Sequence, residues 1–295
     1  MPSTREIRRR IRSIKNIAQI TKALQMVASS KIRRAQERVQ QSRPYAEHLH
    51  ELVSHLANTR SEDVGNEVAL LQQRPARNVA FLVISPDRGN CGALPSNINR
   101  KAASEALEQQ RSLSEGGRRP DIQYIAVGRK GRDFIIRTQQ HLIAEFTNLG
   151  DRPSMNDATA IAEVAIDAFL KEEVDVVYMV YPKFVNTVTQ QPIAVQLLPV
   201  QPPEQEESER GNIDYIYEPS PNEIYQALLP RYVDTLVYQA LLELIASQYS
   251  AQMVAMKNAT DNANELLQDL SLTYNKARQA AITTQILEVV SGSQA

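Results

Sequence analysis

Arg231–Ser291 has the sequence RYVDTLVYQALLELIASQYSAQMVAMKNATDNANELLQDLSLTYNKARQAAITTQILEVVS, and neither glycine nor proline occurs in its 61 residues. Helix interiors exclude both residue types, because proline lacks an amide donor and glycine loses more backbone entropy on folding. At 1.5 Å per residue, a helix of this length spans roughly 90 Å. A globular domain of the roughly 170 residues in the middle of the chain would be only about 40 Å across. We therefore expect a helix that extends well beyond any such domain.

The N-terminal segment has a similar composition, because Pro44 is the only glycine or proline from Ser3 to Val64. Positions taken alternately three and four residues apart are mostly apolar there: Ile7, Ile11, Ile14, Ala18, Thr21, Gln25, Ala28, Ile32, Ala35, Val39, Ser42, Ala46, Leu49, Val53 and Leu56. The same spacing occurs near the C-terminus, at Met253, Met256, Thr260, Ala263, Leu267, Leu270, Tyr274, Ala277 and Ala281. A repeat of 3.5 residues makes a narrow seam that one helix buries against another in a left-handed coiled coil. We expect an intramolecular antiparallel coiled coil, with a homodimeric coil or a buried helical bundle as the alternative.

Between the two helical segments, short apolar runs alternate with helical patterns. The expected strands are Val79–Ile84, Ile122–Val127, His141–Phe146, Val174–Tyr181 and Pro192–Leu198. The expected helices are Ser96–Leu113, Lys130–Thr138 and Asn156–Lys171. This alternation favours a parallel, Rossmann-like sheet with helices on its faces.

The predicted fold class is therefore α/β: a Rossmann-like α/β domain inserted between two long terminal helices that form an antiparallel coiled coil. We assign residues 1–60 to the N-terminal coiled-coil helix, 75–200 to the Rossmann-like domain and 220–291 to the C-terminal coiled-coil helix. Ser220-Pro221-Asn222-Glu223 resembles a capping box at the start of the last helix. Pro44 predicts a local kink, Pro230 a bend, and the acidic Gln201–Arg210 an exposed loop.

The loop Asp87-Arg88-Gly89-Asn90-Cys91-Gly92 follows the first strand, where open α/β sheets bind ligands. It matches neither G-x-G-x-x-G nor G-x-x-x-x-G-K-[ST], so it lacks both the close-approach glycines and the phosphate-binding lysine. A nucleotide-binding α/β enzyme is therefore an alternative only, and we expect Gly89 and Gly92 to serve backbone turns. Cys91 is expected in the core, because a lone cysteine is usually buried.

Charge is segregated along the chain, whose formal net charge is −1. Residues 1–43 hold twelve basic side chains and two acidic ones, a net charge of +10. Such a one-sided helix predicts a charged partner: nucleic acid, an anionic membrane or an acidic protein surface. From Gln279 to Ala295 the only charge is Glu288, in a run rich in Ala, Ile, Val and Thr. We expect that apolar tip to be covered, by the chain's own core or by another protein.

Other site classes find little support. Cys91 is the only cysteine, and His48, His50 and His55 have spacings that place them on different helix faces, so we expect no disulfide and no metal site. We also expect no catalytic residue and no cofactor. The longest apolar runs, such as Val79–Ile84, are far shorter than the ~20 residues of a membrane span, and the N-terminus lacks a signal-peptide core. A cytoplasmic protein is expected.

Five stretches resemble the F-type ATP synthase gamma subunit family: Ile20–Lys31 (ITKALQMVASSK), Asp87–Gly92 (DRGNCG), Tyr181–Thr187 (YPKFVNT), Met253–Ala263 (MVAMKNATDNA) and Tyr274–Thr283 (YNKARQAAIT). The resemblance covers essentially the whole chain in the right order. It implies a non-catalytic central rotor shaft, one copy per complex, that couples ion flow through a membrane ring to ATP synthesis or hydrolysis at the beta subunits and regulates ATPase activity. The implied partners are the alpha and beta subunits of the catalytic ring, the epsilon subunit and the membrane c-subunit ring, with no nucleic acid. The implied location is the cytoplasmic face of the cell membrane, as a peripheral component of the complex.

The resemblance also implies contact residues. Arg278, Gln279 and Thr283 match the positions that catch a beta loop, while Lys22 and Leu24 match the charged loop contact. The family often has Met where Leu24 stands and Arg where Gln252 stands, so the usual strength of that loop contact is in question. A sole cysteine and no insert before the last helix argue against the dithiol switch of chloroplast members.

Two alternatives to a rotor remain from the residues themselves: a coiled-coil nucleic-acid-binding adaptor and the nucleotide-binding enzyme. For the coil itself, antiparallel seams pair positions whose residue numbers add to a constant, here 267, 274, 281 or 288. We expect 274, which pairs Ile7 with Leu267 and Ala18 with Met256, because the family places the Leu24 and Gln252 positions close together. In that register, everything from Leu272 onward lacks a partner helix.

Overall fold

The computed structural model describes residues 3–58, 68–114, 120–201 and 221–292. The chain divides into two compact units. The coil unit comprises Met1–Lys31 with Gln252–Ala295, and the domain unit comprises Ile32–Ala251. Two helices belong to both units: α1 covers Thr4–Asn58 and α6 covers Pro221–Gly292. Both run through their internal prolines, Pro44 and Pro230, without a break in helix assignment.

Helix α6 begins at the expected proline, while Ser220 of the predicted capping box lies outside the described residues. The acidic stretch expected as an exposed loop, Gln201–Arg210, lies outside them as well except for Gln201, which is exposed. None of the described helices carries an apolar stretch long enough to cross a lipid bilayer.

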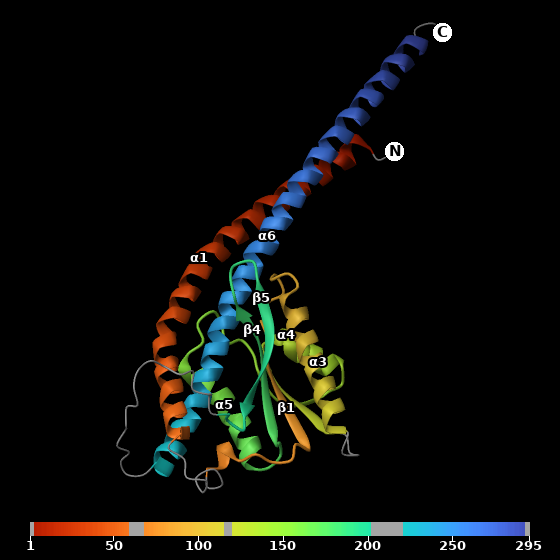
Figure 1. Ribbon diagram of the computed structural model, residues 1–295. Helices are drawn as coiled ribbons and strands as arrows, with labels where there is room; N and C mark the ends of the chain where they lie inside the picture. Colours follow the sequence, from red (N-terminus) through yellow and green to blue (C-terminus); the bar gives the residue numbers. More distant parts are fainter. Residues whose placement is uncertain (1–2, 59–67, 115–119, 202–220, 293–295) are drawn as a thin grey trace. The chain divides into compact units, whose positions relative to one another are not determined.

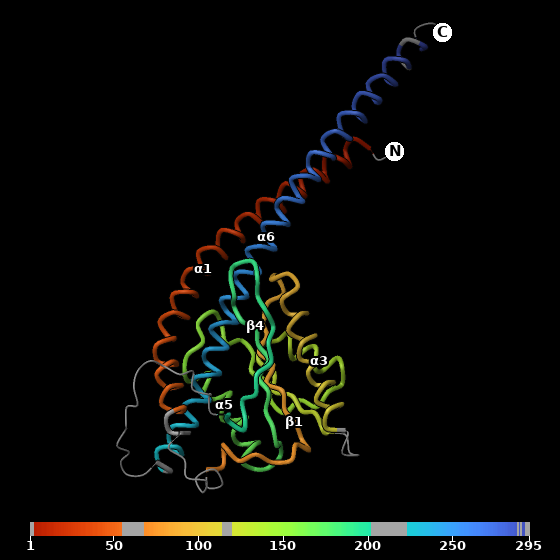
Figure 2. Tube along the Cα trace, in the orientation of Figure 1, coloured from red at the N-terminus to blue at the C-terminus, as the bar shows by residue number. Residues whose placement is uncertain are grey.

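In the coil unit, α1 and α6 pack along the predicted seam (Figure 2). Ile7, Ala18, Thr21 and Ala28 are buried on α1, and Thr260 and Ala263 on α6; no other described residue of this unit is fully buried. The other seam positions of this unit are half-buried on both helices, as far as Ala277 on α6, whereas Ala281 is exposed. The 3.5-residue repeat therefore identified the buried faces of both helices correctly.

The register expected for this seam is wrong by one heptad. The side chains of Thr21 and Thr260 are hydrogen-bonded at 2.8 Å, and the Arg8 guanidinium lies 5.4 Å from the centre of the Tyr274 ring. These pairs add to 281 and 282, not 274. A register of 274 would place the Thr21 hydroxyl opposite Met253, whereas the observed one gives each buried threonine a polar partner across the seam. The domain unit has the same register, because His50 Nδ1 lies 3.2 Å from the Tyr232 hydroxyl.

The domain unit contains a five-stranded sheet in the order β3-β2-β1-β4-β5. The strands are β1 (Asn78–Ile84), β2 (Asp121–Val127), β3 (His141–Phe146), β4 (Val176–Phe184) and β5 (Gln190–Leu198). All five lie close to their predicted positions. The first four are parallel, as expected, whereas β5 is antiparallel to β4, so the predicted parallel sheet is a mixed one at this edge. The connection from Phe184 to Gln190 is short enough for a hairpin, and a parallel pair would need a longer crossover.

Helices cover both faces of this sheet (Figure 1). Helices α3 (Leu94–Ser114) and α4 (Arg129–Arg137) lie on one face. Helix α5 (Met155–Leu170) lies on the other face, together with the N-terminal part of α6; a short 3-10 helix, η1, covers Ala69–Leu71. The central strand β1 is buried from Val79 to Ile84, as its continuous apolar run predicts for a strand covered on both faces.

Candidate functional site

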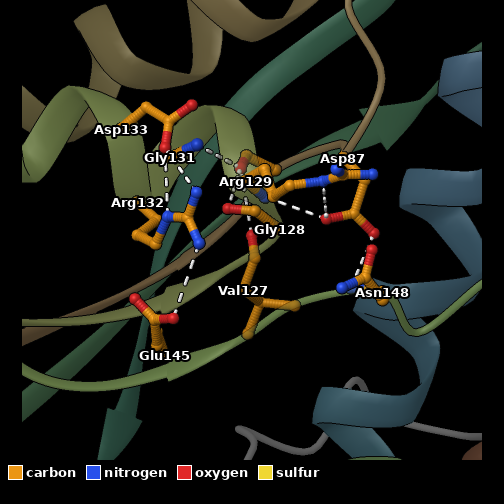
Figure 3. Close-up of polar contacts among 10 residues, drawn as sticks. Asp87, Val127, Gly128, Arg129, Gly131, Arg132, Asp133, Glu145 and Asn148 are labelled. Atoms are coloured by element: carbon orange, nitrogen blue, oxygen red, sulfur yellow. Dashed lines mark hydrogen bonds and ion pairs between the residues drawn. The ribbon is translucent and has the colours of Figure 1, made fainter.

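The loop after β1 lies at the carboxyl edge of the sheet, where the topology places a ligand crevice. Asp87, in the loop after the central strand β1, lies beside Arg129 and Asn148 (Figure 3). Its carboxylate accepts hydrogen bonds from the backbone N–H of Arg129 at 3.0 Å and of Asn148 at 3.0 Å. The Arg129 guanidinium adds an ion pair at 3.7 Å. Arg129 opens α4, and the N-terminal end of a helix is the place where nucleotide-binding folds hold phosphate. In this chain a carboxylate of its own fills that place.

A second backbone N–H in the first turn of α4, that of Gly131, also has a partner within the chain. Ser85 Oγ accepts the Gly131 N–H at 2.7 Å and donates to the Val127 carbonyl at 3.0 Å. Gly128, between β2 and α4, has φ +86°, and a Cβ there would lie 1.9 Å from the Ser85 carbonyl oxygen. The backbone at this edge is therefore closed on itself, with Gly128 as the residue that permits the close approach.

The space left at this edge is small. A cavity of about 20 Å³ lies among Ser85, Asp87 and Gly128 on the sheet side and Leu241, Leu244 and Gln248 of α6. Pockets for small-molecule ligands usually measure about 300–1,000 Å³. Helix α6 thus fills the crevice that a nucleotide would need, which weighs strongly against the enzyme alternative.

Cys91 is buried in this loop, as expected, with 1% of its surface exposed. Burial raises the pKa of its thiol to about 11, although its own backbone and the Lys130 charge act in the opposite direction. A protonated, enclosed thiol is a poor nucleophile. In the described ranges, no three His, Cys, Asp or Glu side chains come together as metal ligands.

The residues expected to contact partners all lie in the coil unit. Lys22 is exposed, and its ammonium group donates to Gln25 Oε1 at 3.3 Å. Leu24 and Gln252 are half-buried. The observed register places Leu24 level with Lys257, so Leu24 and Gln252 are offset by five residues, roughly 7.5 Å along the axis. The structure therefore does not bring this pair directly opposite each other, contrary to what the family resemblance implies.

Arg278, Gln279 and Thr283 are exposed on the last turns of α6. The Thr283 hydroxyl donates to the Gln279 carbonyl at 3.0 Å, so these two lie one turn apart on one face. From Arg278 to Gly292, every side chain that the structure describes is exposed. Several of them are large and apolar, and they keep roughly half to three-quarters of their surface: Ile282 47%, Ile286 57%, Leu287 63% and Val289 72%. We call this segment, Arg278–Gly292, the bare tip.

The basic face of α1 is exposed as well. Four basic side chains of the coil unit are exposed: Arg5, Arg9, Arg12 and Lys15. In the part of α1 that the structure describes within this unit, Glu6 is the only acidic residue. Glu6 pairs with Arg10 at 3.4 Å, and both side chains keep more than half of their surface. Exposed pairs of this kind contribute little, so most of the positive charge is available to a partner.

Exposed apolar side chains on α1 outside the seam were missed from the sequence. Ile17, Ile20, Met26 and Val27 are large apolar residues off the seam, and each keeps about half or more of its surface, from 48% to 61%. Apolar residues outside the 3–4 spacing were the available signal. They add exposed apolar side chains to the coil unit besides those of the bare tip, although Ile17 and Met26, nine residues apart, leave the helix in opposite directions.

Comparison with known proteins identifies the family. The family model described as ATP synthase matches residues 3–295. The ATP synthase gamma chain of Roseiflexus castenholzii is 50% identical over 297 aligned residues, which cover 100% of this chain and 99% of that one. The chain belongs to the ATP synthase gamma chain family. The gamma chain of Chloroflexus aurantiacus is 47% identical over 296 residues with the same coverage.

Solved structures agree at the level of the fold. A chain of the Euglena gracilis mitochondrial ATP synthase superposes with a TM-score of 0.64 at 19% identity, covering 99% of this gamma chain and 93% of that chain. A chain of the Tetrahymena thermophila mitochondrial ATP synthase central stalk gives a TM-score of 0.60 at 24% identity, covering 81% and 99%. This gamma chain is a non-catalytic subunit of the ATP synthase, and as part of that complex it is a peripheral, membrane-associated component.

Proposed function

We propose that the coil unit is a rotor shaft that turns inside the ring of alpha and beta subunits, on the cytoplasmic face of the cell membrane. The bare tip is the observation that carries this proposal. Apolar side chains on an unpaired helix end are unstable in water unless another surface covers them. A ring that encloses the tip on all sides suits a segment that is exposed on all sides.

Contacts with the ring would be of two kinds. At the tip, Arg278, Gln279 and Thr283 would hold a beta loop by hydrogen bonds, since all three are exposed. Lower on the shaft, Lys22 and Leu24 would meet an acidic beta loop, and the basic residues of α1 would strengthen that attraction. Because Gln252 replaces the Arg common in the family, one cation is missing from the shaft, roughly 7.5 Å along the axis from Leu24. The domain unit would lie against the epsilon subunit and the c-subunit ring.

Single-molecule rotation tests this function. The chain, one copy per complex, is assembled with the alpha and beta subunits of its source, and a bead is attached to the domain unit. We expect ATP-driven rotation of the bead in one direction. Arg278→Ala should reduce assembly or torque, whereas Lys276→Ala, an exposed cation two residues earlier, is the matched control. A complex that hydrolyses ATP while the bead never rotates would refute the rotor role.

The nucleic-acid alternative makes a different prediction. A basic helix that tracks phosphates would bind DNA with an affinity that falls steeply as salt increases. If the positive charge of the chain serves an acidic protein surface, the isolated chain should show no salt-dependent DNA binding. For the location, protease should reach the chain in everted membrane vesicles and not in intact cells.

A further inference from the structure

Within the domain unit, the two long helices are attached very unequally. Helix α1 contributes two residues to the core of the described part, Leu49 and Val53. Helix α6 contributes eight: Tyr225, Leu229, Tyr232, Val233, Val237, Ala240, Leu241 and Leu244. The first third of α6 is therefore part of the domain itself, whereas α1 lies at its margin.

Three polar side chains of α6 add directional attachments to this apolar packing. The Glu243 carboxylate accepts the Phe184 N–H of β4 at 3.0 Å. One turn further, the Ser247 hydroxyl donates to the Pro182 carbonyl of the same strand at 3.1 Å. Asp234 accepts the Thr159 hydroxyl of α5 at 2.9 Å. We call Asp234, Glu243 and Ser247 the α6 clamp.

The clamp holds α6 from two sides. Nine residues separate Asp234 from Glu243, and at 3.6 residues per turn this is two and a half turns. Their side chains therefore leave the helix in opposite directions, one toward α5 and the other toward β4. Glu243 and Ser247 are four residues apart and share a face. Two attachments on opposite sides of a rod form a couple that opposes rotation of the rod about its own axis, which apolar contacts resist weakly because they have no direction.

The surroundings of the clamp residues restrict their movement. Ser247 and Asp234 are buried, with 0% and 4% of their surface exposed. The strand segment that Glu243 and Ser247 hold ends in a stiff turn, in which Asn186 Oδ1 accepts the N–H groups of Val188 and Thr189 at 2.9 and 2.8 Å. Burial raises the pKa of the Glu243 carboxyl, while the Phe184 N–H and the Lys183 and Arg43 charges oppose that shift. Glu243 is half-buried, and a carboxylate that is partly withdrawn from water is costly unless it is hydrogen-bonded, so its bond to Phe184 offsets that cost.

From this geometry we infer that the α6 clamp transmits torque between the domain unit and the shaft, with Glu243 as its main positioning residue. Helix α6 carries the torque, and α1 lies at the margin of the domain unit. This inference rests on the rotor function proposed above.

The test measures torsional stiffness in the assembled complex. The bead on the domain unit is followed while the complex is paused, and the width of its angular fluctuations gives the stiffness of the path from the bead to the ring. We expect Glu243→Ala to lower this stiffness and the torque under viscous load. Glu243→Gln should restore much of both, because the amide oxygen still accepts the Phe184 N–H. Glu265→Ala, an exposed carboxylate elsewhere on α6, should leave both unchanged.

The outcomes separate the two proposals. If the unmodified complex does not rotate, the rotor function fails. If it rotates and Glu243→Ala has unchanged stiffness and torque, the clamp inference fails while the rotor function stands. Should Glu243→Ala unfold, as shown by circular dichroism, Ser247→Ala gives the same comparison from the second attachment to β4. Val53→Ala, on α1, should lower the torsional stiffness less than Glu243→Ala does. An equally large decrease would overturn the inference that α6 transmits the torque.

Discussion

The hydroxyl groups of Thr21 on α1 and Thr260 on α6 meet at 2.8 Å inside the seam of the coil unit, although 239 residues separate them in the sequence. Both side chains are buried, and each hydroxyl also lies within hydrogen-bond distance of its own helix: Thr21 of the Ile17 and Ala18 carbonyls, and Thr260 of the Met256 carbonyl. Since each hydroxyl has one proton, one threonine donates across the seam while the other donates to its own helix. Among small apolar neighbours, a polar pair of this kind is satisfied in one register only. Buried polar positions set register in coiled coils in the same way.

Cysteine cross-linking checks the register directly. In a Cys91→Ser background, Ala18→Cys with Ala263→Cys should form a disulfide readily, because these residues add to 281 and are both buried. Ala18→Cys with Met256→Cys, which add to 274, should not. Non-reducing electrophoresis distinguishes the linked chain, and efficient linking of the second pair alone would contradict the observed register.

A double-mutant cycle measures the threonine pair. Thr21→Val and Thr260→Val each remove one hydroxyl and should lower the free energy of unfolding by about 0.5–1.5 kcal/mol. The double variant should lose less than the sum, because it leaves no polar group facing an apolar one. Denaturant unfolding followed by circular dichroism gives the four values, and strict additivity would show that the two hydroxyls do not interact.

Gly128→Ala should destabilise the domain unit by at least about 2 kcal/mol. The new Cβ would lie 1.9 Å from the Ser85 carbonyl oxygen, and the residue would keep φ at +86°. Gly150→Ala is the matched control, since Gly150 has φ +75° but nothing within 4 Å of the added carbon. The control therefore isolates the backbone strain of about 1 kcal/mol. Equal melting temperatures for the two variants would mean that the Ser85–Gly128 contact is not tight.

Cys91 predicts a loss of stability at alkaline pH. Its pKa is raised from 9.0 to about 11 in the folded chain. The folded chain thus keeps the proton while the unfolded chain releases it, so this contribution to stability is complete below pH 9 and is lost between pH 9 and 11. The loss should approach roughly 2 kcal/mol by pH 11. Cys91→Ala should lack this component, and the native thiol should react with Ellman's reagent at pH 8 only after unfolding.

Hydrogen exchange tests the bare tip. In the isolated chain, amides from Ile282 to Ser291 should exchange fast, because a lone helical end of this length is marginal in water. In the assembled complex the same amides should be protected, while those near Thr260 should be protected in both. Truncation after Arg278 should leave folding of the domain unit and the paired coil intact. A tip that is protected in the isolated chain would mean that its own chain covers it.

The sequence predicted the buried faces of the coil but not their alignment. Spacing alone identifies Ile7, Ala18 and Ala263 as seam residues, and the structure buries all three. Each shift by a heptad again places seam residues opposite seam residues, so periodicity cannot choose among the four registers. The choice depends on individual partners, such as Arg8 with Tyr274, that no pattern of apolar residues encodes.

The domain shows a similar division. Apolar runs located all five strands, including the half-buried β3 and β5, because such a run marks a strand whichever way it runs. The direction of β5 depends on the short β4–β5 connection, which allows only an antiparallel hairpin. The role of Asp87 could not be predicted, since its partners Arg129 and Asn148 are 42 and 61 residues away and only the sheet brings them together.

Small residues in the seam have one more consequence. Where Ala18, Ala28 and Ala263 face the partner helix, the two axes can approach to about 8 Å, the close end of the range for packed helices. The distance between the two helices of the coil unit is therefore set by residues in the seam. The charge and hydrophobicity of its outer surface are set by other residues, such as Lys22 and Met26. Substitutions on the outer surface can change its charge or hydrophobicity without changing the distance between the two helices. Substitutions in the seam can change that distance without altering the outer surface that a partner contacts.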